Sequence, residues 1–111
     1  MPVVKAVSVS RAAAAEVDSI LDWYLSQGEF DRAVKVQTSF AAAFRRIGAN
    51  PGVGHFRDDL TTQPVRFLNV HGYLVVYEET DCEVLVHHVL HGARDVERIL
   101  HPDRPPRDDE D

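Results

Sequence analysis

The chain has 111 residues, of which 44% are apolar and 27% charged, and its formal net charge is −6. A chain of this length builds one hydrophobic core and leaves no room for a separate cofactor domain. No stretch approaches about 18 uninterrupted apolar residues, and the start lacks the apolar run of a secretory signal. The single cysteine excludes an internal disulfide. We therefore expect a cytoplasmic protein with no membrane span.

The negative charge opposes sequence-independent binding to nucleic acid, which depends on neutralising phosphates with basic side chains. It leaves a local basic patch possible. The last eleven residues carry five acids and two bases. We divide the chain into one domain over residues 1–100 and a charged, disordered tail over residues 101–111.

The first ten residues predict a β-strand, because β-branched residues dominate there. Ser10 is suited to cap the N-terminus of a helix from about Arg11 to Ser26. Apolar side chains recur along this helix at intervals of three and four residues, which predicts one buried face. The face comprises Ala13, Val17, Ile20, Leu21, Tyr24 and Leu25.

Gly28 separates this helix from a second one, predicted from about Phe30 to Ile47 and stopped by Gly48. Two amphipathic helices joined by a short loop form an antiparallel hairpin. The apolar stripe that we expect to be buried on the second helix contains one polar residue, Gln37. Its members are Phe30, Ala33, Val34, Gln37, Phe40, Ala41, Phe44 and Ile47.

After a loop over residues 52–63, the period of the pattern changes from helical to β. Strands are predicted at residues 65–70, 73–79 and 83–90, with tight turns at His71-Gly72 and at 80–82 between them. This arrangement predicts an antiparallel meander. The middle strand is nearly all apolar, so we expect it to be central and covered on both faces.

Residues 91–100 predict a loop and one helical turn, with Val96, Ile99 and Leu100 packed inward. The order of elements is then β-α-α-β-β-β, which defines an α+β domain. An N-terminal strand and the meander form an antiparallel sheet, and the helical hairpin buries its apolar face on one side of it. The other side is predicted to remain open for a partner.

Three histidines near the end of the domain, His87, His88 and His91, raise the question of a metal site. Neighbouring residues on a strand point to opposite faces, so His87 and His88 do not easily share an ion. We therefore predict no metal and no cofactor. For His91 we expect a structural hydrogen bond.

This order of elements, with specific residues in it, resembles the ParE/RelE superfamily of bacterial toxins. The first helix is similar to the family pattern at residues 14–24, and residues 51–54 form the Pro-x-x-Gly stop that is typical after the second helix. The strands are similar at residues 65–67 and 73–77. The most specific stretch is Val-Leu-His-Gly-Ala-Arg-Asp at residues 89–95, which resembles the ending of the ParE branch.

The resemblance implies a plasmid- or chromosome-encoded toxin that is bound by a cognate, ParD-like antitoxin in a hetero-oligomer. ParE-type toxins inhibit DNA gyrase, whereas RelE-type toxins cut messenger RNA in the ribosome. RelE-type toxins carry an arginine and a C-terminal tyrosine where this chain has Leu74 and Leu100, and its loop at residues 50–64 has no lysine. We therefore predict a ParE-like inhibitor of gyrase rather than an enzyme.

Two rival hypotheses remain open. One is a RelE-like messenger RNA endonuclease that uses His88, His91 and Arg94 as catalytic residues. The other is an inactive remnant that only binds the antitoxin. His55 and His88 stand where relatives often have arginine, and both changes remove a fixed charge.

The expected contact residues form two groups. The residues expected to bind the target are Arg66, His88, His91, Arg94 and Asp95. Those expected to bind the antitoxin are Trp23, Gln37, Tyr73 and Tyr77, since aromatic side chains concentrate in interface cores. Each has a structural alternative, such as a helix-capping role for Asp95 and core packing for the two tyrosines. We expect no membrane contact and no sequence-specific binding to DNA.

Overall fold

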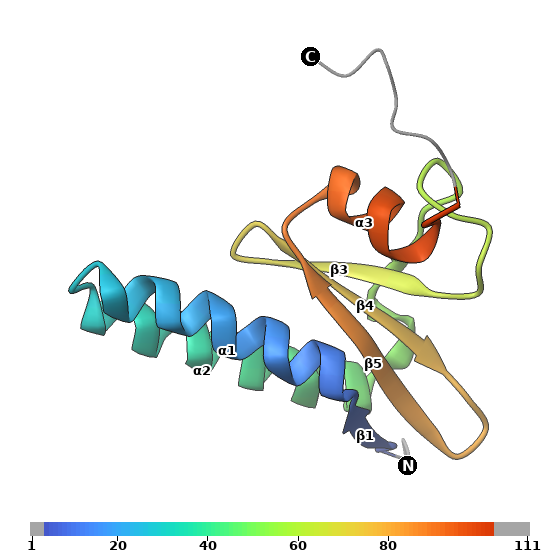
Figure 1. Ribbon diagram of the computed structural model, residues 1–111. Helices are drawn as coiled ribbons and strands as arrows, with labels where there is room; N and C mark the ends of the chain where they lie inside the picture. Colours follow the sequence, from blue (N-terminus) through green and yellow to red (C-terminus); the bar gives the residue numbers. More distant parts are fainter. Residues whose placement is uncertain (1–3, 104–111) are drawn as a thin grey trace.

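The structure, a computed structural model, describes residues 4–103 apart from the side chains of Ala93 and Arg94. A long helical hairpin extends from one side of a twisted sheet, and a short helix lies against the other side (Figure 1). The hairpin consists of α1 (Arg11–Ser26) and α2 (Phe30–Ala49), and the short helix is α3 (Ala93–Leu100). No helix among the described residues has the length and apolar character needed to cross a bilayer.

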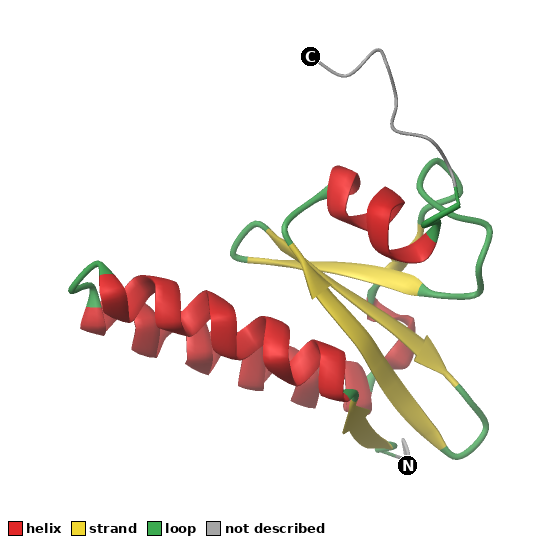
Figure 2. Cartoon of the chain, viewed as in Figure 1, coloured by secondary structure: helices red, strands yellow, loops and turns green. Residues whose placement is uncertain are grey.

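The sheet has five strands in the order β1-β5-β4-β3-β2, drawn as yellow arrows in Figure 2. The predicted antiparallel meander is formed by β3 (Arg66–Val70), β4 (Tyr73–Glu79) and β5 (Glu83–Leu90). β1 (Ala6–Val9) runs parallel to β5, so the complete sheet is mixed. β2 (His55–Phe56) pairs with β3 and was not predicted, because two residues are too short to show an alternating pattern.

The helix boundaries follow the sequence signals closely. The Oγ atom of Ser10 accepts a hydrogen bond from the N–H of Ala13 (3.0 Å), which confirms the predicted cap of α1. At the end of α2 the prediction was wrong, because Gly48 continues the helix instead of stopping it. A Cβ at Gly48 would lie 2.8 Å from the carbonyl oxygen of Lys5, so this glycine lets α2 approach the chain just before β1.

The buried face of α2 differs from the predicted stripe. Phe30 and Val34 are 63% and 60% exposed, and Gln37 and Ala41 are also exposed. The residues that turn toward the rest of the domain are Ala33, Val36, Phe40, Ala43 and Ile47. Alanine and other apolar residues occupy so much of this helix that periodicity alone did not determine which side is buried.

Both faces of β4 are covered, as predicted for the central strand. Val75 and Tyr77 belong to the core beneath the hairpin, whereas Val76 belongs to a second core under α3. The expectation of an open second face was wrong, since α3 forms two turns and buries Val96 completely. The physical reason is that the second face is itself apolar and must be shielded from water. The buried residues of this second core are Val65, Phe67, Val76, Leu90 and Val96.

The turn between β3 and β4 uses left-handed backbone at both of its residues. His71 has a φ of 53° and Gly72 a φ of 83°, which suits the twist of a two-residue hairpin. The Nε2 atom of His71 lies 2.9 Å from the Oγ of Ser39, so the turn is linked to the middle of α2.

The predicted tail begins within the described chain and continues beyond it. His101 is part of the fold, because its Nε2 atom lies 3.0 Å from the Oγ1 of the buried Thr61. Residues 104–111 lie outside the described residues.

The side chain of Tyr77 connects the core to the segment after α2. Its ring is fully buried, and its hydroxyl donates to the carbonyl of Pro51 (2.7 Å) and accepts from the N–H of Gly54 (2.7 Å). A Cβ at Gly54 would lie 2.6 Å from this hydroxyl. The Pro-x-x-Gly stretch, which contains the 3₁₀ turn η1 (Pro51–Val53), therefore docks onto one tyrosine.

We predict that Tyr77→Phe lowers the free energy of unfolding by about 1–3 kcal/mol, because it leaves the half-buried carbonyl of Pro51 and the buried N–H of Gly54 without partners. Urea denaturation followed by circular dichroism measures this change. Tyr73→Phe is the matched control, since it removes the same group from a half-buried site, and its effect should be smaller. Equal losses in the two variants would contradict the prediction.

Candidate functional site

Four ring-bearing side chains meet where the end of α1 lies beside the start of β4 and the loop before α3. We call Trp23, Tyr24, Tyr73 and His91 the aromatic junction. The ring centroids of Trp23 and Tyr24 are 5.0 Å apart, and those of Tyr73 and His91 are 5.1 Å apart. Trp23 is 56% exposed and His91 is also exposed, so the junction reaches the surface. It brings together two predicted antitoxin residues and one predicted target residue.

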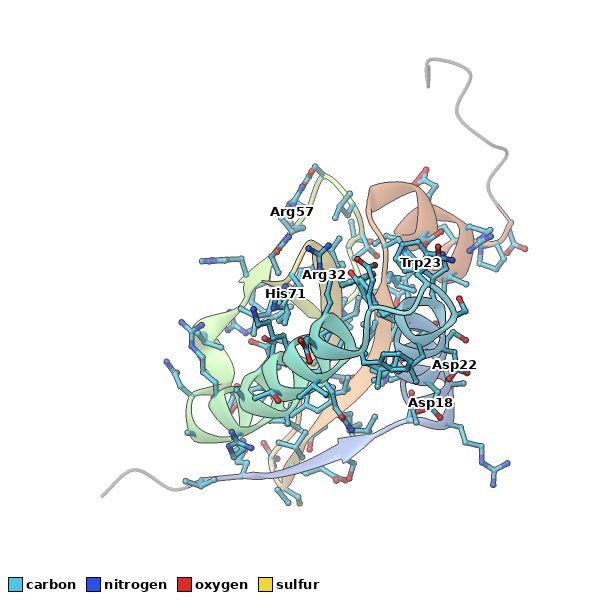
Figure 3. The ribbon with its side chains drawn as sticks, turned by 90° about the vertical axis from the view of Figure 1, so that its left-hand side faces the viewer. Asp18, Asp22, Trp23, Arg32, Arg57 and His71 are labelled. Atoms are coloured by element: carbon cyan, nitrogen blue, oxygen red, sulfur yellow. The ribbon has the colours of Figure 1, made fainter. Side chains whose placement is uncertain are left out.

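Figure 3 views the hairpin from its tip and labels Trp23 on α1, with Arg32 on the neighbouring α2. Asp18 and Asp22 are labelled lower on α1, and both side chains are exposed. The helix that carries the large exposed indole therefore also carries exposed carboxylates. This combination of an aromatic anchor and a charged margin is typical of a protein-binding surface.

Tyr73 joins this surface to the core. Its ring lies 5.9 Å from that of Phe40, which is buried under the hairpin. Burial of the phenol and its hydrogen bond to Tyr24 raise the pKa of Tyr73 to about 12. The protonated hydroxyl is thus stabilised in the folded chain and serves as a hydrogen-bonding group.

His88 is held by α1. β1 ends opposite Val86, so the part of β5 that follows has no neighbouring strand on that side. Glu16 fills this place, because its Oε1 atom accepts from the N–H of Val89 (2.8 Å) and its Oε2 atom lies 3.1 Å from Nδ1 of His88. His88 is thus part of the attachment of α1 to β5.

The other strand histidine has a separate partner. The register of β4 and β5 shifts between Val76 and Tyr77, which leaves His87 as the extra residue of a bulge. Its Nε2 atom lies 3.0 Å from the Oε1 of Glu78. Within the described part of the chain, no group of three or more His, Cys, Asp and Glu side chains is placed to hold a metal ion.

Asp95 interacts with its own helix. One carboxylate oxygen accepts from the N–H of His91 (3.1 Å), and the other accepts from the guanidinium of Arg98 (3.0 Å). These contacts hold the loop before α3 against the start of that helix. They agree with the alternative prediction that Asp95 caps α3. Arg94 was predicted to bind the target, but its side chain lies outside the described residues.

Arg66 lies away from the aromatic junction, at the β2–β3 edge of the sheet. Its guanidinium donates to the carbonyl of Gly54 (3.3 Å) and stacks over the ring of Phe56, 4.2 Å from the centroid. The predicted target residues therefore do not form one surface.

The predicted antitoxin residues also separate. Gln37 lies on the exposed side of α2 with Phe30 and Val34. The structure corrects the assignment of Tyr77, because a fully buried side chain cannot reach a partner while the core is packed.

Three residues that shape these sites were missed in the sequence. Glu16 carries no local signal, since its partners on β5 are more than 70 residues away. Tyr24 was assigned to the buried face of α1, and its contact with Tyr73 needed the sheet to be in place. Phe56 was predicted to lie in a loop. The only sign of a role in the sequence was that it is an isolated aromatic residue.

One comparison with known proteins identifies a family. The sequence model described as "ParE toxin of type II toxin-antitoxin system, parDE" matches residues 7–96. No curated protein matches the chain. Among solved structures, a chain described as "Chromosomal ParDE TA system from P. aeruginosa" is similar, with a TM-score of 0.66 and 20% sequence identity. The match covers 78% of this chain and 95% of that chain, and at this identity it shows a shared fold.

We predict that alkaline pH weakens the fold partly through Tyr73. The folded chain raises the pKa of this group from 10.0 to about 12, so its stabilising contribution is complete below pH 10 and is lost as the pH rises toward 12. Denaturant titrations at increasing pH should show the free energy of unfolding falling over this interval. The fall should be shallower in Tyr73→Phe, and an identical pH dependence in both proteins would refute the assignment.

Proposed function

The chain belongs to the ParE toxin family of type II toxin–antitoxin systems, and from this membership we propose that it inhibits DNA gyrase by protein–protein contact. We further propose that a cognate, ParD-like antitoxin neutralises it in a hetero-oligomeric complex. The family match supports both statements, because it spans β1 to α3 and so includes every element that positions the aromatic junction.

The main argument for inhibition rather than RNA cleavage is that α3 covers the second face of the sheet. Attack by a 2′-hydroxyl needs a base, an acid and cations gathered around one phosphate. The central positions of that face are instead filled by Val76 and Leu90, which pack against Val96.

The histidines that a nuclease would use are also separated by their contacts. The ring of His88 is bound to Glu16 on α1, and the ring of His91 packs on Tyr73. This arrangement supports a protein that works by binding.

For the antitoxin we propose a contact along the hairpin, with Trp23 and Tyr73 at its centre. An exposed indole beside a partly buried tyrosine gives a large apolar area and fixed hydrogen-bonding groups. A second exposed row on α2, with Phe30, Val34 and Gln37 at helical spacing, extends the apolar surface of the hairpin. An antitoxin segment that follows the hairpin would cover both.

We predict that the purified full-length chain blocks supercoiling of relaxed DNA by gyrase and leaves ribosome-bound messenger RNA intact. Added antitoxin should restore supercoiling at an equimolar ratio. Cleaved message with normal supercoiling would instead assign the chain to the ribonuclease branch. Normal supercoiling, intact message and retained antitoxin binding would identify an inactive antitoxin-binding remnant.

We predict that Trp23→Ala weakens antitoxin binding at least about tenfold, since central aromatic residues carry about 2 kcal/mol or more of interface free energy. Calorimetric titration with the antitoxin measures the change. Asp22→Asn is the matched control, because it alters an exposed neighbour on the same helix and should change affinity less than about threefold. Comparable effects of the two substitutions would remove Trp23 from the centre of the interface.

A further inference from the structure

The outward side of α2 carries a row of mostly apolar side chains that the sequence predicted to be buried. Phe30 and Val34 are 63% and 60% exposed, Gln37 and Ala41 are exposed, and Phe44 is half-buried. These five residues follow one another at intervals of four and three, which is the spacing of a coiled-coil interface. They therefore form one line along the helix, which we call the α2 seam.

The α2 seam is held in place by the rest of the domain. The ring of Phe44 stacks on that of Phe40, with the centroids 6.4 Å apart, and Phe40 is buried beneath the hairpin. The next position of the same row is Gly48, where the chain before β1 crosses the helix and a Cβ would lie 2.8 Å from the carbonyl oxygen of Lys5. The seam thus runs from the projecting tip of the hairpin to the strand β1 (Figure 1).

Two opposite charges lie along one edge of the seam. Asp31 follows Phe30 and Arg45 follows Phe44, so both charged residues occupy the same position of the seven-residue repeat. They are 14 residues apart, which is about 21 Å along the helix axis. Both are exposed, and within the described part of the chain neither forms an ion pair. The helix therefore presents an acid at one end of this edge and a base at the other.

We propose that the α2 seam pairs with the seam of a second copy of this chain, with the two α2 helices antiparallel about a two-fold axis. Val34 then faces Phe44 of the second copy, and Gln37 faces Ala41 of the second copy. This alignment places Asp31 beside Arg45 of the second copy. The two-fold axis repeats every contact, because a symmetric pair uses the same patch on both subunits.

Charge complementarity selects this occupant and this orientation. A parallel pair of α2 helices would place residues of equal number side by side, so that Asp31 would lie near Asp31 and Arg45 near Arg45, and like charges repel. The antiparallel pair turns both contacts into ion pairs, and charges that flank a seam determine which partner and orientation are chosen. The polar Gln37 within the seam disfavours shifted alignments, since a polar residue at such a position specifies the register.

The length of the seam limits the affinity of the pair. It spans about two heptads, fewer than the three or four that are typical of a self-sufficient coiled coil. The domain already holds α2 as a helix, so pairing requires no folding of the segment. We therefore expect a reversible dimer whose fraction rises with protein concentration. An antitoxin that covers the hairpin, as proposed above, would use the same row and would compete with the second copy.

The test is sedimentation velocity of the full-length chain without antitoxin over a range of concentrations. The average mass should rise from that of one chain toward that of two. Arg45→Asp should weaken dimerisation at least about tenfold, because it places two acids together at both ends of the pair. Arg46→Asp is the matched control, since it makes the same charge reversal at the next exposed residue, about 100° around the helix. Its effect should stay within about twofold.

A charge exchange tests the alignment itself. Asp31→Arg alone should weaken dimerisation as Arg45→Asp does, because it brings two arginines together. The double variant Asp31→Arg, Arg45→Asp should recover to within about threefold of the unchanged chain, since each pair is again opposite in sign. Both substitutions oppose the helix dipole, so any loss of helix stability adds up in the double variant. Recovery of the dimer therefore separates pairing from stability, which circular dichroism melts measure in each variant.

The outcomes distinguish the possible occupants of the seam. A chain that stays monomeric at every concentration, equal weakening by Arg45→Asp and Arg46→Asp, or a double variant that does not recover overturns the proposal. A monomer whose antitoxin binding is lost in Val34→Glu also overturns it and assigns the seam to the antitoxin alone. A dimer formed by a chain that neither inhibits gyrase nor binds an antitoxin would leave the pairing established and contradict only the proposed function.

Discussion

The double hydrogen bond of the Tyr77 hydroxyl is the contact on which the geometry of the domain depends. The phenol ring belongs to the core under the hairpin, while the hydroxyl holds the turn that follows α2 through Pro51 and Gly54. Because that turn leads directly into β2, the same contact sets where Phe56 meets Arg66. A core residue thus positions the edge of the sheet, and the lack of a side chain at Gly54 makes the close approach possible.

The beginning of α1 positions β5, just as the turn after α2 positions β2. Ser10 donates from its hydroxyl to the carbonyl of His87 and from its N–H to the carbonyl of Val86, and Glu16 accepts from the N–H of Val89. Beyond the end of β1, polar groups of the helix therefore bind the backbone of β5 in place of a neighbouring strand. This attachment holds α1 on β5, and farther along the helix Tyr24 contacts Trp23 and hydrogen-bonds to Tyr73.

Two surfaces with different chemistry result from this frame. The aromatic junction offers a large apolar contact with carboxylates nearby, which suits a protein partner. The β2–β3 edge offers one exposed ring, that of Phe56, with the guanidinium of Arg66 stacked on it.

The sequence by itself determined the elements and the family resemblance, because both reside in local patterns. Caps, glycines and the change of hydrophobic period place α1, β4, β5 and the turn at His71-Gly72 where the structure has them. Part of the candidate site was also accessible in this way, since Trp23, Tyr73 and Arg66 stand out in the sequence as aromatic or basic residues within otherwise regular elements.

Only the tertiary structure decided which surfaces these elements present. It turned Phe30 and Val34 outward, covered the second sheet face with α3, withdrew Tyr77 into the core and joined Glu16 to residues 72 and 73 positions away. Each of these outcomes depends on contacts between segments that are distant in the chain. Periodicity describes one segment at a time, and an alanine-rich helix with apolar residues around most of its circumference has no unique buried side until its neighbours are in place.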